Sequence, residues 1–400
     1  MTVPGVDRHP MDTGAVTTGT RPRKAATARS WIERAAPSVV GGWLAARLAL
    51  IVSFVLAEAL APHVTLPYGR TKLDEGLLAW DGQYYRAIAE LGYAHADPDA
   101  VRFFPAYPLL GRWLSALIGH RTDIALLLIA NLAALGAGFA VWRLVRDLGL
   151  PERTAGRAAV LMAIFPAASA LGFAYAEPLF LLLFCIGAAA IVRGQPGRAV
   201  LPFVALGLLR PTGVLVAAPA FIAAVGAARS WRAGRVDAVG RVISWCSAVA
   251  APLVGLGAYL LWLEETTGDG SAPLEWQRKF RNGFREPITR LFSAIGDIAT
   301  GDFRQAYNIA LALVLIVGTV LAVRRIAWAW IGYAAVGLAV ALAANNIDSL
   351  GRYGLMLVPA WAVGYAETFR RRDVWAAICG LSTLGFVWYT TLVWLGQVVP

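Results

Sequence analysis

A single carboxylate, Asp81, lies in an unusually aromatic stretch that follows the first long apolar run of the chain. The stretch from Trp80 to Tyr93 reads Trp-Asp-Gly-Gln-Tyr-Tyr-Arg-Ala-Ile-Ala-Glu-Leu-Gly-Tyr, and Phe-Phe-Pro follows at 103–105. A carboxylate among aromatic rings at a membrane surface is suited to take a proton from the hydroxyl of an amphipathic molecule, such as a lipid-linked sugar. These residues indicate an enzyme.

The same stretch has helical periodicity. Asp81, Tyr85 and Ile88 fall on one side of a helix, and Arg86 and Glu90 contribute to a polar side. This pattern predicts an amphipathic helix lying in the membrane interface. An alternative needs no chemistry: the helix is an anchor, and Asp81 is its N-cap.

Three further charged residues interrupt apolar runs at points that suggest the outer ends of spans: Glu177, Arg210 and Arg352. Glu177 is either catalytic or simply a cap or ion-pair partner. Arg210 needs an anionic partner near the membrane, which could be a phosphate or Glu177. Arg352 could hold a phosphate with two hydrogen bonds, or pair with the nearby Asp348.

Composition settles the broad class of the protein. Of the 400 residues, 58% are hydrophobic and only 15% are charged, whereas soluble proteins are about a quarter charged. The net charge of +11 comes from short clusters between apolar runs, which is typical of cytoplasmic loops and gives no reason to expect a nucleic acid partner. The three cysteines lie in apolar runs, and the four histidines are scattered, so no metal-ligand spacing is present.

The basic clusters also predict topology, because positively charged loops face the cytoplasm. Clusters at 143–157, 193–198, 229–241, 324–325 and 370–372 leave four segments to face outward, and the N-terminus inside. The expected protein is all-α and polytopic, with about eleven spans. They lie near 38–60, 122–142, 158–176, 178–192, 199–209, 214–228, 242–263, 304–323, 327–345, 353–369 and 374–398.

Two regions complicate this topology. The runs at 199–209 and 214–228 are short for straight spans, and they are expected to be broken helices around Arg210-Pro211. The long outer segment 264–303 is itself basic, and its cations could hold an anionic ligand. Residues 1–36 are expected to form a disordered cytoplasmic tail, and 37–400 a single membrane domain.

Several strings together resemble the PIG-V-type mannosyltransferases, a family that adds the second mannose to GPI anchors, and their bacterial relatives. The matching residues, in the order of the family, are Trp80-Asp81, Tyr84-Tyr85, Ile88-Ala89, Gly92-Tyr93, Phe103-Phe104-Pro105, Tyr175 with Glu177, Arg210-Pro211-Thr212-Gly213, Gln277 and Arg352-Tyr353. The resemblance extends from about residue 40 to about residue 360. Eukaryotic members carry a His near the position of Tyr84, and nothing after about residue 370 matches, so a bacterial acceptor fits better than a GPI anchor.

The resemblance implies a GT-C glycosyltransferase at the outer face of the plasma membrane, with a polyprenyl-phosphate-mannose donor and a glycolipid or glycan acceptor. Asp81 would be the general base of an inverting single displacement. Metal use is left open, with a divalent cation as the one candidate cofactor. The residues expected to bind the donor or substrate are Trp80, Tyr84, Tyr85, Glu177, Arg210, Gln277, Arg281 and Arg352.

A second class of function is a lipid or solute transporter. Transporters concentrate ionisable groups near the bilayer midplane and often contain repeated halves. Here the polar candidates lie at the ends of spans and no internal repeat is visible, which favours the enzyme.

Overall fold

The computed structural model describes residues 28–66, 69–229, 238–299 and 306–400, and these residues form helices and connecting segments without a strand. The α-helices are α1 Ala28–Leu60, α2 Asp81–Leu91, α3 Ala106–Leu117, α4 Thr122–Asp147, α5 Glu152–Ile164, α6 Glu177–Val192, α7 Val200–Leu209, α8 Ala217–Arg229, α9 Ala238–Thr267, α10 Ala272–Phe280, α11 Pro287–Ala299, α12 Ala306–Ala322, α13 Trp328–Leu342, α14 Leu350–Leu355, α15 Ala360–Thr368 and α16 Arg372–Trp394. The expected all-α polytopic fold class is confirmed.

Five apolar helical segments within the described residues are long enough to cross a membrane: Ser30–His63, Thr122–Asp147, Pro211–Arg229, Val239–Thr267 and Arg372–Trp394. Shorter apolar helical segments lie at Glu177–Val192, Pro196–Leu209, Ala306–Ala322 and Trp328–Leu342. Each of the expected spans contains a helix, but two are interrupted. The run at 158–176 ends as α5 and continues as the 3-10 helix η4 (Pro166–Leu171), and the run at 353–369 is divided between α14 and α15.

The first helix begins earlier than the sequence indicated. Residues 28–36, assigned to a disordered tail, form the first turns of α1, while residues 1–27 lie outside the described part of the chain. Two contacts explain the extension: Trp31 stacks on Trp142 with 6.0 Å between ring centroids, and Arg34 pairs with Glu152 at 3.0 Å. Tertiary contact therefore outweighs the polar composition of this segment.

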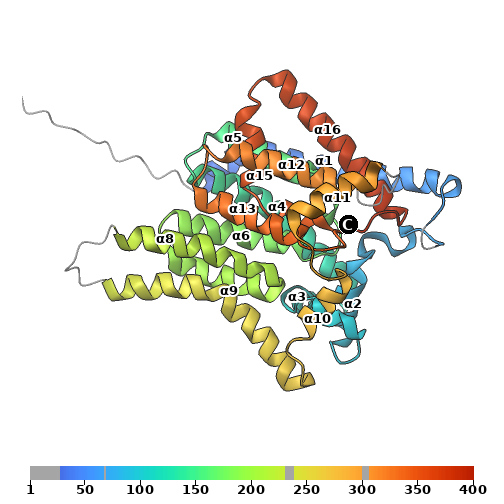
Figure 1. Ribbon diagram of the computed structural model, residues 1–400, viewed down its shortest axis with the longest axis horizontal. Helices are drawn as coiled ribbons and strands as arrows, with labels where there is room; N and C mark the ends of the chain where they lie inside the picture. The colour runs from blue at the N-terminus through green and yellow to red at the C-terminus, as the bar shows by residue number, and fades with distance from the viewer. Residues whose placement is uncertain (1–27, 67–68, 230–237, 300–305) are drawn as a thin grey trace, which may run out of the picture.

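The helices pack as a single bundle (Figure 1). Helix α4 packs on α6, α1 packs on α5 and α16, and α12 packs on α15. Helix α7 approaches α9 so closely that a Cβ on Gly207 would lie 2.1 Å from the carbonyl oxygen of Pro252, and one on Gly255 would lie 2.0 Å from that of Val204. Small residues at such crossings let backbones meet, which is how apolar helices associate where no hydrophobic effect drives them together.

The arginine in the middle of the apolar helix α1 is joined to polar groups of the interior. Arg47 donates to Oδ1 of Asn131 at 2.6 Å and to the carbonyl oxygen of Leu171 at 2.9 Å. These hydrogen bonds tie α1 to α4 and to η4. These contacts indicate a structural role for Arg47.

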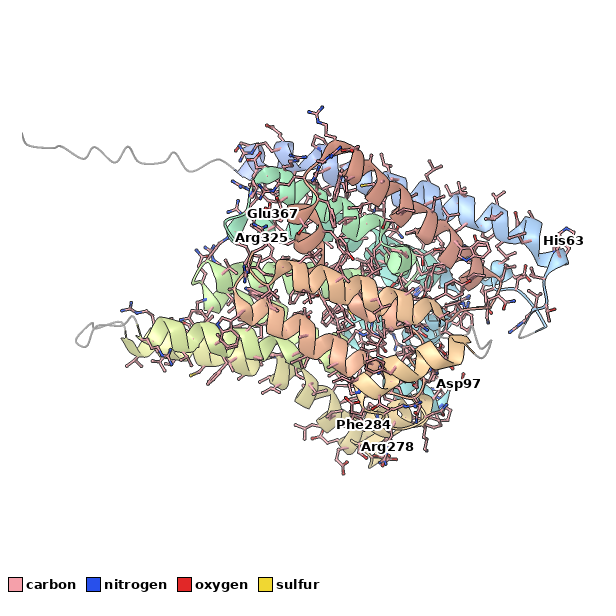
Figure 2. All side chains as sticks on the ribbon, turned by 45° about the horizontal axis from the view of Figure 1, so that its top comes forward. His63, Asp97, Arg278, Phe284, Arg325 and Glu367 are labelled. Atoms are coloured by element: carbon pink, nitrogen blue, oxygen red, sulfur yellow. The ribbon has the colours of Figure 1, made fainter. Side chains whose placement is uncertain are left out.

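The residues labelled in Figure 2 lie toward two ends of the bundle. Arg325 and Glu367 lie at one end, and His63, Asp97, Arg278 and Phe284 lie toward the other. The second end also holds α2, α3 and α10, which lie together in Figure 1. Arg325, from one of the clusters expected inside, and Arg278, from the long segment expected outside, therefore lie toward different ends of the bundle.

Candidate active site

Four charged side chains from distant parts of the sequence form an alternating chain of ion pairs. Arg210 pairs with Oε1 of Glu177, Arg352 lies 3.3 Å from the same oxygen, and Arg352 also pairs with Oδ2 of Asp81 at 2.5 Å. The side chain of Glu177 is 1% exposed and that of Arg352 is 6% exposed. The structure thus brings together Asp81 and the three charged residues that interrupt apolar runs in the sequence.

Asp81 is the first residue of α2, and its backbone is set by a strained neighbour. Trp80 is the N-cap residue and has a φ of 61°, in a region that non-glycine residues rarely adopt. The indole Nε1 of Trp80 donates to the carbonyl oxygen of Val393 at 3.2 Å, and the ammonium of Lys72 lies 4.9 Å from its ring centroid. Such strain persists only where surrounding contacts over-determine it, and it concentrates at functional sites.

Arg352 is positioned by a similar device. Ser349, the N-cap of α14, has a φ of 67°, and its Oγ accepts a hydrogen bond from Arg352 at 3.1 Å. Gly351 and Gly354 let α14 lie against its neighbours, because a Cβ on Gly354 would be 1.9 Å from the side chain of Leu315 on α12. Both residues of the Asp81–Arg352 pair therefore follow shortly after a non-glycine residue with a positive φ.

Glu177 and Arg210 are placed by helix ends. Glu177 is the first residue of α6 and Pro178 follows it, so the carboxylate lies at the positive end of the helix dipole. Arg210 is the extended residue between α7 and the 3-10 helix η6 (Pro211–Val216), which confirms the expected break in this apolar run. Gly213 is required there, since a Cβ would lie 2.3 Å from the carbonyl oxygen of Leu206.

The ion-pair chain leaves hydrogen-bonding capacity unused. Oε2 of Glu177, Nε of Arg352 and Oγ1 of Thr212 are buried and have no hydrogen-bond partner within the described residues. An unsatisfied buried polar atom costs about 1–3 kcal/mol, and in native proteins it calls for an explanation such as a bound ligand. All three belong to residues of the candidate site.

A cavity of about 390 Å³ opens against this chain. Its wall is largely apolar but carries four arginines, Arg102, Arg210, Arg281 and Arg352. The other lining residues are Asp81, Tyr85, Phe103, Phe104, Leu209, Pro211, Thr212, Val214, Leu215, Pro273, Leu274, Gln277, Phe280, Val340, Ala343 and Tyr353. This cavity is called the arginine cavity below.

A second cavity, of about 690 Å³, is also lined by Asp81. It is called the polar cavity below, and its lining residues are Arg70, Lys72, Glu75, Trp80, Asp81, Gln83, Tyr84, Ala87, Asp97, Arg102, Phe280, Asn346, Asp348 and Val399. Asp81, Arg102 and Phe280 line both cavities. The carboxylate of Asp81 is therefore on a wall common to two binding spaces of different character.

The predicted substrate-binding residues divide between these two spaces. Tyr85, Arg210, Gln277, Arg281 and Arg352 line the arginine cavity, and Glu177 supports it from within the protein. Trp80 and Tyr84 line only the polar cavity. The sequence pattern did not divide the eight residues between donor and substrate, because adjacent residues in α2 cannot be assigned to different cavities without knowing which helices pack on each side.

The structure also shows protein contacts for residues whose roles the sequence left open. Trp80, and not Asp81, occupies the N-cap position of α2. Arg210 has a protein partner in Glu177, and Arg352 pairs with Asp81 and Glu177. On α2, Tyr85 and Ile88 are buried while Arg86 and Glu90 are exposed, as the periodicity predicted.

The tyrosine of α2 that lines the polar cavity is held in a neutral state. Tyr84 donates to Oδ2 of Asp99 at 3.1 Å and stacks on Phe103 with 4.6 Å between centroids. Burial and the adjacent Asp99 carboxylate raise the pKa of Tyr84 above that of a free phenol, partly offset by Arg102. Its ring is therefore a fixed, uncharged surface.

Arg102 is a site residue that sequence reasoning missed. Its guanidinium lies 4.8 Å from the ring centroid of Phe103 and 4.5 Å from that of Phe280, and it pairs with Asp99 at 3.3 Å. The signal available was its position directly before the Phe-Phe-Pro string. A basic residue there also fits an ordinary polar loop, and only the packing of α10 shows that Arg102 divides the cavities.

The outer basic segment contributes less to the site than its composition suggested. Arg281 lines the arginine cavity and lies 5.0 Å from the ring centroid of Tyr353, whereas Arg278 and Lys279 are exposed. Figure 2 shows Arg278 at the periphery of the molecule. Within the described ranges, no group of three or more His, Cys, Asp or Glu side chains is arranged to hold a metal ion.

Comparison with known proteins adds distant likenesses only. No family model matches the chain, and no curated protein matches it. The archaeal oligosaccharyltransferase AglB from Archaeoglobus fulgidus, solved in complex with an inhibitory peptide and a dolichol-phosphate, is 15% identical with a TM-score of 0.45. The alignment covers 88% of this chain and 55% of that one.

A structure of the Archaeoglobus fulgidus oligosaccharyltransferase tethered with an acceptor peptide gives a similar result, with 14% identity and a TM-score of 0.44. That alignment covers 92% of this chain and 56% of the other, so the chain spans about half the length of the structures it matches. A likeness of this degree assigns no activity. Any function must be argued from the geometry of the site.

Proposed function

We propose that this protein is a GT-C type glycosyltransferase that moves a mannosyl residue from a polyprenyl-phosphate donor to an acceptor hydroxyl. The observation that carries the proposal is the position of Asp81, on the wall shared by the arginine cavity and the polar cavity. A general base must reach the proton that it removes at the point where donor and acceptor meet. A shared wall provides such a point.

The arginine cavity suits a lipid phosphate. Its apolar lining would accept the first isoprene units, and its guanidiniums would accept the phosphate through charge-assisted hydrogen bonds. Arg210 and Arg352 are already paired with Glu177 and Asp81, whereas no ion pair joins Arg281 to a carboxylate within the described residues. Arg281 is therefore the first anchor available to an arriving phosphate.

The ion-pair chain then connects donor binding with base activation. A phosphate in the arginine cavity would compete with the Asp81 carboxylate for Arg352, which lies 2.5 Å from Oδ2. Glu177 keeps the guanidinium of Arg352 in place at 3.3 Å while this exchange occurs. In this scheme Asp81 is released to accept a proton only when a donor is bound.

The reaction would be a single displacement. The acceptor oxygen forms a bond to the anomeric carbon, the bond from that carbon to the phosphate oxygen breaks, and the hydroxyl proton passes to Asp81. Polyprenyl phosphate leaves with the electron pair, and the arginines stabilise its charge. Attack from the polar cavity, opposite the phosphate, would invert the anomeric centre.

The mannosyl specificity and the bacterial setting rest on the resemblance of the motifs to PIG-V-type enzymes. A location of the site at the outer face of the plasma membrane is supported by the separation in Figure 2, where Arg325 lies at one end of the bundle and Asp97 at the other. Cysteine labelling of intact cells at positions 83 and 269 should succeed without permeabilisation. Labelling only after permeabilisation would reverse the proposed orientation.

The direct test is incubation of the purified protein with radiolabelled polyprenyl-phosphate-mannose and a bacterial lipid extract. We expect label to move into a product that resists mild acid, which cleaves the donor. Donor binding without any transfer would refute the enzyme and favour a carrier of polyprenyl lipids. Transfer from the matching glucose donor at an equal rate would refute mannose specificity while retaining the glycosyltransferase.

A further inference from the structure

The two cavities at Asp81 differ in their balance of charge. The arginine cavity contains four arginines and a single lining carboxylate, Asp81. The polar cavity contains three cations and four carboxylates, namely Arg70, Lys72, Arg102, Glu75, Asp81, Asp97 and Asp348. The charge of the arginine cavity therefore favours binding of a phosphate, and the charge of the polar cavity disfavours it.

Each cation of the polar cavity is paired with a carboxylate, although Asp99, the partner of Arg102, lies outside the lining. Lys72 lies 2.8 Å from Glu75, Arg70 lies 4.0 Å from the same carboxylate, and Arg102 pairs with Asp99 at 3.3 Å. A ligand with its own negative charge would have to displace these pairs. An uncharged ligand would not.

The remaining polar groups suit hydroxyls. Gln83 lies one turn before Arg86 on α2, and its side-chain amide makes no hydrogen bond within the described residues. Asn346 and Asp97 also face the polar cavity, so amide donors, amide acceptors and carboxylate oxygens are all present. A ring of hydroxyls can use every one of these groups.

Two aromatic rings complete the polar cavity. Trp80 is held by the hydrogen bond to Val393 and by Lys72, and Tyr84 is fixed against Phe103. Rigid rings with a polar edge present apolar area at a small cost in entropy. The C–H faces of a pyranose provide a matching apolar surface.

We propose that the polar cavity binds an uncharged sugar unit of the acceptor and selects against a phosphorylated one. The proposal rests on the function proposed above, since Asp81 would take the proton from a hydroxyl of this sugar. It assigns Trp80 and Tyr84, predicted to bind the donor or the substrate, to the acceptor. Arg102 and Phe280 separate the bound sugar from the donor phosphate.

Binding can be tested without transfer. Saturation-transfer NMR on the full chain in lipid nanodiscs would use methyl α-mannoside, methyl α-glucoside and methyl β-galactoside, each beside its 6-phosphate. We expect at least one neutral glycoside to bind and its 6-phosphate to bind at least about ten-fold more weakly. Equal or tighter binding of the phosphates, or binding of no neutral glycoside, would overturn the proposal.

Two variants locate the binding. Gln83→Ala should lower the affinity for the neutral glycoside about three- to ten-fold, which corresponds to the loss of one or two neutral hydrogen bonds. Arg86→Ala, one turn away on the exposed side of α2, is the matched control and should bind as the wild type does. Equal binding by both variants would place the sugar elsewhere.

The transfer assay separates this proposal from the function on which it rests. If a neutral glycoside binds in a Gln83-dependent manner but no sugar is transferred from any polyprenyl-phosphate donor, the sugar site stands and the glycosyltransferase fails. If transfer occurs and Gln83→Ala leaves the KM for the acceptor unchanged, the glycosyltransferase stands and the sugar site fails.

Discussion

Glu177 and Glu367 are both buried glutamates paired with arginines, yet their surroundings differ. Glu367, at 5% exposure, accepts from Thr154 through Oε1 and pairs with Arg370 through Oε2 at 2.6 Å. Glu177 is 0% exposed, shares Oε1 between two arginines and leaves Oε2 without a partner in the described residues. One carboxylate is fully satisfied and the other is not.

The difference shows how a purely structural ion pair can be distinguished from an ion pair of a functional site. Arg370 reaches out to water with 63% of its side chain exposed, so the Glu367 pair closes the end of α15 and needs nothing further. Around Glu177 the arginines point into a cavity. Buried ion pairs are weak evidence of stabilisation by themselves, and their unsatisfied atoms are the better guide to function.

The largest effect is expected at Asp81, where the ion-pair chain meets both cavities. Asp81→Asn keeps the size of the side chain but removes the proton acceptor, and loss of a general base typically lowers rates about 10²–10⁴-fold. Glu367→Gln, at the other end, should leave the rate unchanged. The measurement is the initial rate of sugar transfer, with donor affinity as the check of folding. Near wild-type transfer by Asp81→Asn would exclude it as the base and leave Glu177 as the next candidate.

The two glutamates should differ in their contribution to stability. Glu177→Ala leaves Arg210 buried without its carboxylate partner, while Arg352 keeps Asp81, and breaking a buried ion pair typically costs about 3–5 kcal/mol. Glu367→Ala should cost only about 1–2 kcal/mol, because the freed Arg370 can turn to water. Thermal unfolding of both variants in detergent gives the comparison. Equal shifts in Tm would show that the two clusters are energetically alike.

The smallest expected effect is a difference in donor affinity between variants of two neighbouring arginines, Arg281 and Arg278. Arg281→Ala should weaken donor binding by about 1.5–3 kcal/mol, the value of a hydrogen bond to a charged group. Arg278→Ala, exposed at the periphery, should change donor affinity by less than about 0.5 kcal/mol. Fluorescence titration with a short-chain polyprenyl phosphate would measure both. If the exposed arginine proves the more important, the phosphate binds outside the arginine cavity.

The sequence predicted the helices well, but it predicted the contacts between them less well. The apolar runs and the Arg210-Pro211 break are local signals, and the structure confirms them. Asp81, Glu177, Arg210 and Arg352 could each be singled out because a charge in an apolar run requires a partner. Their union in one chain depends on how α2, α6, α7 and α14 meet, and spacing along the sequence does not contain that information.

Other features could not be read from local pattern at all. The positive φ of Trp80 and Ser349 follows from tertiary contacts, since neither residue favours that conformation by itself. The division of α2 between two cavities depends on Arg102 and Phe280, whose separation in sequence is long. The helical start of α1 at Ala28 similarly depends on α4 and α5.

The wall between the cavities is built from two separate segments, and this has a kinetic consequence. Phe280 ends α10, while Arg102 precedes α3, and the ring and the guanidinium are only 4.5 Å apart. Any outward shift of α10 would merge both spaces into one trough. Spent lipid carrier and elongated glycan would then depart through a common opening, so release of one product should be timed with release of the other in each turnover.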